Sequence, residues 1–290
     1  MAVLKLKKRS LETGIIPGFM GILNVTPDSF SDGGSEIPLK KRIELLLEAG
    51  TDILDIGGES TRPGAETISI REELSRVIPA LELTREISKR VIISIDTRKT
   101  EVARECLMRD ADIINDVSGF RFDPAMLQTA LDFESGVVAM HSRSTPDKMQ
   151  SAENLEYPHG VETVLSELKM LVDRLVLAGI PRTRIIADAG IGFAKSAELC
   201  AEITRSGLLF RSLGCMTLSA PSRKAFIGKF SGEKDASLRD PGTCGAAISS
   251  ALHGYDLLRV HNVKAVREAL AVFFACEKEI AGKSSLRGGE

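Results

Sequence analysis

The sequence predicts an α/β protein built as a single (β/α)₈ TIM barrel. Short apolar, β-branched runs alternate with longer amphipathic segments along nearly all of the 290 residues, and eight such pairs can be counted. A chain of this length is long enough to bury a large core. Polar side chains occur within or just after the apolar runs, which is where barrel enzymes carry their active sites.

The eight predicted strands are these apolar runs. They cover residues 19–25, 53–56, 91–95, 113–117, 136–140, 184–187, 215–218 and 257–260. The predicted helices have apolar residues near every third or fourth position, which is the spacing of one helix face. They cover residues 39–49, 72–87, 99–108, 124–131, 161–177, 197–203, 243–252 and 263–274. Each strand precedes its helix, as in the repeating unit of a barrel.

A doubly wound open sheet shares this alternation of strands and helices. Its dinucleotide-binding form needs a Gly-x-Gly-x-x-Gly turn after an early strand, and no such turn occurs there. We therefore expect the closed barrel, with residues 1–282 as one domain and residues 283–290 as a disordered tail.

The composition argues against several classes of protein. Lys and Arg total 38 against 40 for Asp and Glu, so there is no excess of positive charge that would attract nucleic acid. No apolar run reaches the roughly 18 residues that cross a bilayer, and the basic start lacks the apolar stretch of a signal peptide. The cysteines and histidines show no spacing typical of zinc sites or disulfide frameworks. We expect a cytoplasmic protein with no nucleic-acid or membrane partner.

Asp96, Asn115 and Asp188 would project into one cavity from the third, fourth and sixth strands. Buried acceptors that lack a partner are energetically costly, so this cavity suits a ligand with several N–H donors. A flat, nitrogen-rich heterocycle has this property. The alternative is a polar interior that holds only water.

Basic residues lie near the same end of the predicted barrel: Arg62, Arg223, Lys224, Arg259 and His261. One guanidinium group can bind two phosphate oxygens at once through parallel hydrogen bonds. Barrels commonly hold phosphate near their seventh and eighth strands. Arg259 and His261 share one strand face through the two-residue period. The alternative for each residue is a solvated surface charge. Two loops, 26–34 and 57–65, are rich in glycine and hydroxyl side chains and could close over a substrate.

Residues 21–34 (GILNVTPDSFSDGG) and 55–64 (DIGGESTRPG) closely resemble the two signatures of the dihydropteroate synthases. Shorter motifs fall where that family has its later ones, at residues 94–97, 115–119, 140–141, 192–193, 222–224 and 259–261. The resemblance covers about residues 18–274. It implies a (β/α)₈ barrel that condenses 6-hydroxymethyl-7,8-dihydropterin diphosphate with 4-aminobenzoate, giving 7,8-dihydropteroate and pyrophosphate.

The resemblance also implies a role for each matching residue. The pterin would be bound by Asp96, Asn115, Met140, Asp188 and Lys224. The diphosphate would be held by Asn24, Arg62, Arg259 and His261, with Asn24 also a ligand of Mg²⁺. The 4-aminobenzoate would be framed by Phe30, Thr61, Pro63, Phe193 and Ser222. The residues expected to act in catalysis are Asp96, Lys224 and Arg62. The resemblance further suggests a homodimer.

The implied mechanism is dissociative. Mg²⁺ and the cationic side chains neutralise the departing pyrophosphate, and the electron-rich dihydropterin stabilises the carbon cation that remains. Asp96, ionised near the ring, would stabilise this cation electrostatically. The arylamine is already nucleophilic, so no strong general base is needed. Sulfonamides mimic 4-aminobenzoate and are expected to compete with it.

Several positions depart from the family pattern. They are Ala189, Cys200, Ala220, Pro221 and Asn262, together with the Ser-Arg-Ser that follows His141. Two alternatives to the synthase therefore stay open. One is a paralogue that binds pterin without turning it over, or that uses an altered substrate. The other is a pterin-dependent methyltransferase, which would have no reason to retain residues 61–63 or the cluster of basic residues.

Overall fold

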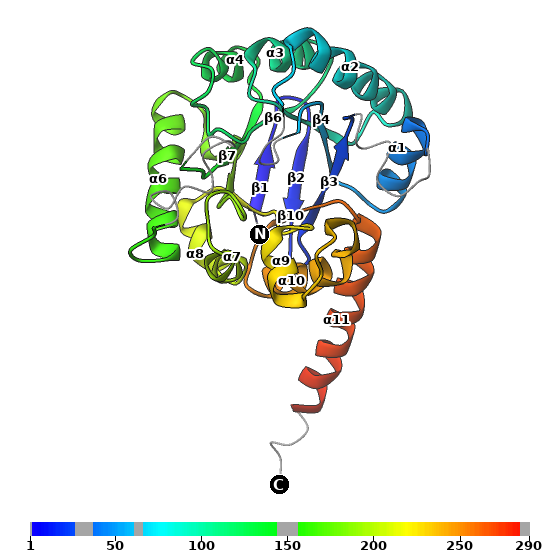
Figure 1. The fold of residues 1–290 in the computed structure, drawn as a ribbon, viewed down its shortest axis with the longest axis vertical. Coiled ribbons are helices and arrows are strands. Elements are labelled where there is room, and N and C mark those ends of the chain that lie inside the picture. The colour runs from blue at the N-terminus through cyan, green and yellow to red at the C-terminus, as the bar shows by residue number, and fades with distance from the viewer. Residues whose placement is uncertain (1, 27–36, 61–65, 144–155, 285–290) are drawn as a thin grey trace.

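The protein is a closed barrel of eight parallel strands surrounded by helices, which confirms the predicted (β/α)₈ architecture (Figure 1). The computed structural model describes residues 2–26, 37–60, 66–143 and 156–284. The strands follow one another around the barrel in chain order, and the last pairs with the first. Their bounds are β3 (Gly18–Asn24), β4 (Ile53–Gly57), β5 (Ile92–Asp96), β6 (Ile113–Asp116), β7 (Gly136–Met140), β8 (Ile185–Asp188), β9 (Met216–Ser219) and β10 (Leu257–Val260).

Helices cover the outside of the barrel. The predicted ones are α1 (Leu39–Glu48), α2 (Ile70–Ile87), α3 (Thr100–Met108), α4 (Met126–Asp132), α6 (Val161–Leu177), α7 (Ala197–Thr204), α10 (Asp240–Leu252) and α11 (Val263–Ser284). Sequence periodicity missed the short α8 (Gly207–Phe210), α9 (Ala225–Ser231), η3 (Arg182–Arg184), η4 (Arg211–Leu213) and η5 (Ala236–Leu238). Elements of one or two turns do not repeat an apolar face often enough to be recognised.

Side chains alternate between the inside and the outside of each barrel strand. In β4, Leu54 and Ile56 point outward and pack against α1 and α2, whereas Ile53 joins the apolar cluster inside the barrel. Asp55 follows Ile53 on the inner face, two residues closer to the carboxyl end. The barrel interior is therefore apolar toward the amino ends of the strands and polar toward their carboxyl ends.

A hairpin that the sequence analysis did not predict covers the amino end of the barrel. β1 (Ala2–Lys5) pairs antiparallel with β2 (Ser10–Thr13). Leu4 is fully buried in the apolar cluster of the barrel interior. Arg9, between the two strands, donates hydrogen bonds to Asp110 and Asp112, and Arg85 of α2 also donates to Asp112. The basic start of the chain is therefore anchored to the barrel by ion pairs.

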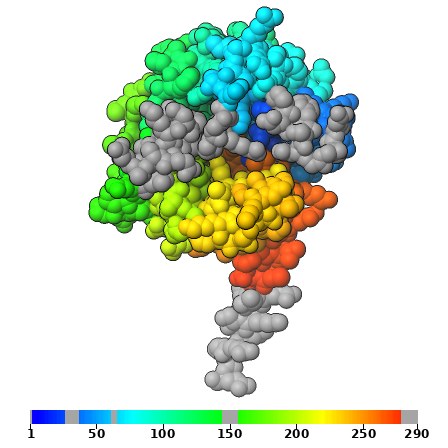
Figure 2. Space-filling view, in the orientation of Figure 1, coloured from blue at the N-terminus to red at the C-terminus, as the bar shows by residue number. Residues whose placement is uncertain are grey.

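Helix α11 extends away from the barrel (Figure 2), and its ribbon continues well beyond the predicted end at residue 274 (Figure 1). It ends at Ser284, whereas residue 282 is the predicted domain boundary. The remaining residues, 285–290, lie outside the described residues. Within the described ranges, neither this helix nor any other is both long and apolar enough to cross a membrane.

The buried hairpin side chain should contribute strongly to stability. Replacing Leu4 with Ala removes apolar contacts from a fully buried position, so we expect the free energy of unfolding to fall by about 2 to 5 kcal/mol. Urea unfolding followed by circular dichroism measures this loss. The control is Ile15→Ala, because Ile15 is 84% exposed and its loss should stay within about 0.5 kcal/mol. Equal, small losses for both variants would contradict a structural role for the hairpin.

Candidate active site

The carboxyl ends of the barrel strands bring most of the predicted polar residues to one opening. Asn24 ends β3, Asp96 ends β5 and Asp188 ends β8. The strand register places Asp96 beside Asn115, and Met140 beside Asp188. Met140 is almost fully buried, as are Asn115 and Asp188. The groups predicted to contact one ligand therefore surround one opening, although they come from separate parts of the chain.

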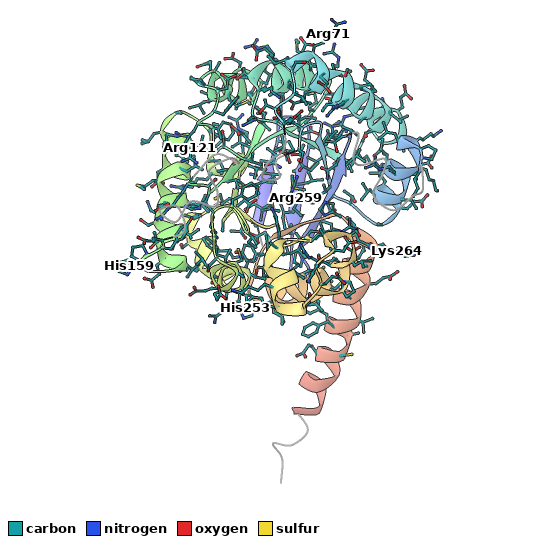
Figure 3. All side chains as sticks on the ribbon, in the orientation of Figure 1. Arg71, Arg121, His159, His253, Arg259 and Lys264 are labelled. Carbon is teal, nitrogen blue, oxygen red and sulfur yellow. The ribbon has the colours of Figure 1, made fainter. Side chains whose placement is uncertain are left out.

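Arg259 of β10 binds two carboxylates across the interior of the barrel. Its Nε donates to Asp55 Oδ2 and its Nη2 donates to Asp96 Oδ2, both at 2.7 Å. In Figure 3, Arg259 lies in the middle of the ring of strands. Burial lowers the pKa of Arg259, but the combined attraction of the two carboxylates is the larger effect, so the pKa is raised overall. Burial also raises the pKa of Asp96 to about 7, against the opposing effect of Arg259.

Asp55 is a site residue to which the sequence analysis gave no role. Its side chain is fully buried on the inner face of β4, and it accepts a hydrogen bond from Asn115 Nδ2 at 3.0 Å. A charged residue in the middle of a buried strand is uncommon. Asp55 is one of the polar residues that the sequence places near the carboxyl ends of the predicted strands, so its position was expected although its partners were not.

The loop after β8 carries Phe193, whose ring contacts Lys224 from the loop after β9. Asp188 Oδ1 accepts the backbone N–H of Gly190 at 2.7 Å, and burial raises the pKa of Asp188. Gly190 has a φ of +66°, and a Cβ there would be only 2.0 Å from the backbone oxygen of His141, so only glycine fits. Lys224 Nζ lies 4.3 Å from the centre of the Phe193 ring, a cation–π distance. Burial lowers the pKa of Lys224 to about 8.

His261 follows β10 and is bonded to Ser222. The Ser222 hydroxyl accepts the backbone N–H of His261 at 3.1 Å and lies 2.9 Å from its Nδ1. Desolvation lowers the pKa of His261 to about 3, and the charges of Arg223 and Arg259 act in the same direction. The ring is therefore neutral at physiological pH. If the hydroxyl donates to Nδ1, the ring proton is on Nε2, where it can serve as a donor.

A cavity of about 440 Å³ lies between β3, α1 and the start of α11. Its polar lining consists of Asn24, Arg42, Arg223, His261, Asn262 and Lys264. The N-terminus of α11 adds the positive end of a helix dipole. Three positively charged side chains and a helix N-terminus around one cavity suit a phosphate-bearing ligand.

The residues at this cavity fit a magnesium ion that binds together with such a ligand. In the part of the chain that the structure describes, no cluster of three His, Cys, Asp or Glu side chains could hold a metal. Asn24 lines the cavity and offers an amide oxygen, a ligand type that Mg²⁺ accepts. Mg²⁺ usually takes its other ligands from water and substrate phosphates, so one protein oxygen beside a phosphate cavity is sufficient.

Lys195 forms a buried network that the sequence analysis missed. Its Nζ lies 2.9 Å from His141 Nδ1 and 3.0 Å from the backbone oxygens of Gly190 and Phe193. His141 Nε2 lies 2.8 Å from Glu167. Burial and the charge of Lys195 lower the pKa of His141 to about 4, so its neutral ring can accept from Lys195 and donate to Glu167. The network joins the loop that carries Phe193 to the end of β7 and to α6.

Four predicted site residues lie outside the described residues: Phe30, Thr61, Arg62 and Pro63. The chain is held in place on both sides of residues 61–65. Glu59 accepts the backbone N–H of Ile68 at 3.0 Å and also a hydrogen bond from Lys99 Nζ at 3.0 Å.

Two of the departures from the family pattern have local partners. Cys200 Sγ accepts the backbone N–H of Gly192 at 3.2 Å, which a side-chain oxygen could also do. Asn262 Oδ1 accepts the backbone N–H of Ala265 in the first turn of α11, and its Nδ2 donates to Asp240 at 3.0 Å. An aspartate at position 262 would face the carboxylate of Asp240, so the amide is the residue that fits here.

Comparison with known proteins agrees with this geometry. A family model described as pterin binding enzyme matches residues 20–261. The chain is 41% identical over 280 residues to the mitochondrial folate synthesis bifunctional protein of Pisum sativum, covering 92% of this chain and 54% of that protein. It is also 40% identical over 256 residues to the dihydropteroate synthase of Synechocystis, covering 87% of this chain and 88% of that one. The chain therefore spans about half the length of the bifunctional relatives that it matches.

Solved structures are similar over nearly the whole chain. The dihydropteroate synthase of Xanthomonas albilineans, solved with 4-aminobenzoic acid, has a TM-score of 0.83 at 36% identity and covers 95% of this chain and 98% of that one. The same enzyme in complex with 7,8-dihydropteroate has a TM-score of 0.82 at 34% identity, with the same coverage.

Protonation of His261 is predicted to destabilise the fold. Its pKa is about 3 in the native state and about 6.5 in an unfolded chain. The native state therefore binds this proton less tightly, and stability is lost as the pH falls below 6.5 toward 3. Between pH 6.5 and 5 the loss from this group is up to about 2 kcal/mol. Urea unfolding at both pH values should show a smaller loss for His261→Gln than for the wild type. The same loss in both proteins would contradict the neutral, buried ring.

Proposed function

Because this chain belongs to the pterin-binding enzymes and, within them, to the dihydropteroate synthases, we propose that it makes 7,8-dihydropteroate for folate synthesis. Its substrates are 6-hydroxymethyl-7,8-dihydropterin diphosphate and 4-aminobenzoate, and its other product is pyrophosphate. The observation that carries this proposal is the position of an acceptor-lined barrel opening next to a cavity lined by positive charge. A ring with N–H donors fits the acceptor-lined opening, and a diphosphate attached to that ring fits the positively charged cavity.

The pterin ring occupies the acceptor-lined opening. Its N–H and amino donors bind Asp96, Asn115 and Asp188, and Met140 packs on the ring. Lys224 approaches the ring from the start of α9, next to Phe193. These buried acceptors favour a ring with donors on several edges, because each acceptor that stays unpaired carries a desolvation cost.

The diphosphate occupies the neighbouring cavity. His261 donates a hydrogen bond to it without carrying charge, and Arg259 binds it in competition with Asp55 and Asp96. Arg62, which lies outside the described residues, adds a further cation. Asn24 would hold Mg²⁺ beside the diphosphate, and the bound ion would supply positive charge close to the leaving group.

The 4-aminobenzoate binds on the outer side of the pterin. Phe193 and Ser222 contribute from the described part of the chain. Phe30, Thr61 and Pro63 complete this subsite from outside it. Sulfonamides share the aniline group and the overall shape of 4-aminobenzoate, so they compete for the same place.

The reaction needs no strong base. The bond between the methylene carbon and the diphosphate oxygen breaks first, and pyrophosphate leaves with the electron pair. The dihydropterin shares the positive charge that remains, and Asp96 stabilises it through its negative charge. The amine lone pair of 4-aminobenzoate then forms the new C–N bond, and the amine releases one proton to water.

The alternatives differ from this proposal in what the site would need. A methyltransferase on the same barrel would need the pterin acceptors but not the neighbouring cavity with its positive charge. A paralogue without activity would bind the pterin diphosphate and release it unchanged. A turnover assay distinguishes both from the synthase.

We further propose that two copies of the chain form a homodimer through helices away from the barrel opening. Large apolar side chains are exposed on α6, α8 and α10, including Met170, Leu177, Leu208 and Leu252. Sedimentation should give twice the mass of the chain. Replacing Leu177 and Leu208 together with Glu should give monomers, whereas Ile15→Glu at the amino end should not. A monomeric wild type at micromolar concentration would overturn this proposal.

The main test is turnover with both substrates and Mg²⁺, using the wild type and Asp96→Asn. The variant keeps a hydrogen-bonding side chain but removes the negative charge, so we expect kcat to fall by about 100-fold or more. Pterin affinity should fall less than kcat. The control is Asp132→Asn on α4, which removes an exposed carboxylate and should turn over at the wild-type rate. Absence of turnover by the wild type would favour the inactive paralogue. A wild-type kcat for Asp96→Asn would contradict the electrostatic role proposed for Asp96.

A further inference from the structure

Asp55 is a buried carboxylate next to the proposed pterin site, and the reaction described above gives it no role. It lies on the inner face of β4 in register with Ser94, two residues below the level of Asp96. Its Oδ2 accepts hydrogen bonds from both Asn115 Nδ2, at 3.0 Å, and Arg259 Nε, at 2.7 Å. Its Oδ1 has no hydrogen-bond partner among the residues that the structure describes.

The bond to Asp55 determines which way the amide of Asn115 faces. A carboxylate only accepts hydrogen bonds, so it can pair with the Nδ2 of Asn115 but not with its Oδ1. Turning the amide over would place Asn115 Oδ1 against Asp55 Oδ2 in a buried place, and it would leave the Asn115 oxygen without a donor there. The Oδ1 of Asn115 must therefore face away from Asp55.

Arg259 strengthens this constraint. Its guanidinium binds Asp55 Oδ2 from β10, on the side opposite to Asn115 in the barrel wall. The positive charge balances the buried carboxylate and fixes its position. The position of Asp55 is therefore fixed by its strand, β4, and by the guanidinium of Arg259. From this fixed position it can keep the amide of Asn115 in one orientation.

The fixed amide gives the ring site a defined pattern of acceptors. Asn115 Oδ1 faces away from Asp55, and the carboxylate of Asp96 lies on the neighbouring strand in register with Asn115. A ring amino group donates to such oxygens. A ring oxo group at the same position has no hydrogen to donate. The oxygens of Asn115 and Asp96 would then face another acceptor and would gain no hydrogen bond from the ring.

We propose that Asp55 is a positioning residue that sets ligand selectivity. By binding Asn115 Nδ2, it makes the site prefer a ring with an exocyclic amino group over the same ring with an oxo group. This inference rests on the proposed function, because it takes a pterin as the ligand. Asp55 acts through Asn115 and does not itself contact the substrate.

Calorimetry with two ligands tests the proposal. The ligands are 6-hydroxymethylpterin and 6-hydroxymethyllumazine, which carries an oxo group in place of the amino group. We expect the wild type to prefer the pterin by about tenfold or more. In Asp55→Asn, the new amide can donate to Asn115 Oδ1, so Asn115 can turn over. Pterin binding should then weaken by about tenfold, and the preference should fall toward one.

The exchanged pair provides a rescue. When Asp55→Asn is combined with Asn115→Asp, an amide and a carboxylate face each other again in reversed positions, and the charge next to Arg259 is kept. The preference for the amino group should return. This variant also serves as the test if Asp55→Asn alone does not fold.

The matched control is Asp112→Asn. Asp112 is also a buried carboxylate paired with an arginine, but it lies near the amino end of the barrel. This substitution should lower stability and leave the amino-over-oxo preference unchanged. If Asp55→Asn weakens both ligands by the same factor, Asp55 has only a structural role and the proposal is overturned.

A measurement on the unaltered protein is independent of any variant. One Nδ2 hydrogen of Asn115 should be protected from exchange with water before any ligand is added, and fast exchange of both would also overturn the proposal. The proposed function fails in a different way. If the wild type binds neither ligand, the pterin assignment itself is wrong. If Asp55→Asn still prefers the pterin over the lumazine, only the role proposed for Asp55 is wrong.

Discussion

The ion pair between Arg259 and the carboxylates of Asp55 and Asp96 is the interaction on which the site depends. Three charged groups are removed from water here, which is energetically costly unless each has a partner. Removing Arg259 would leave two carboxylates close together inside the barrel without a positive charge between them. Arg259 and Asp96 are also groups that the proposed pterin diphosphate would contact, so ligand binding would exchange one set of partners for another.

This arrangement also explains how the barrel interior is divided. The charged groups lie at the carboxyl ends of the strands, and the side chains below them are apolar, from Met20 to Leu257. The hairpin with Leu4 keeps water away from the amino end of this apolar layer. A dry layer below the site keeps the local dielectric low, which strengthens the interactions of Asp96 and Arg259 with each other and with a ligand.

The sequence predicted the barrel well because its signal is local. Apolar runs mark the strands, and the rule that active sites lie at their carboxyl ends placed Asp96, Asn115 and Asp188 together. The hairpin at the amino end was missed because its short strands have little apolar periodicity. The contacts of Asp55 with Arg259 and of Lys195 with His141 were also missed, because residues 204 and 54 positions apart meet only in the folded chain. Spacing along the sequence carries no information about such pairs.

The departure from the family pattern at position 262 is also explained by contacts with residues far from it in the sequence. Asn262 differs from the expected aspartate, but Asp240 already provides a carboxylate there and Arg223 is bound to it. The amide at position 262 completes this group and still accepts the backbone N–H that begins α11. His261, next to it in the chain, therefore keeps its place beside Ser222. The amide at position 262 is therefore compatible with the neighbouring site residues His261 and Ser222.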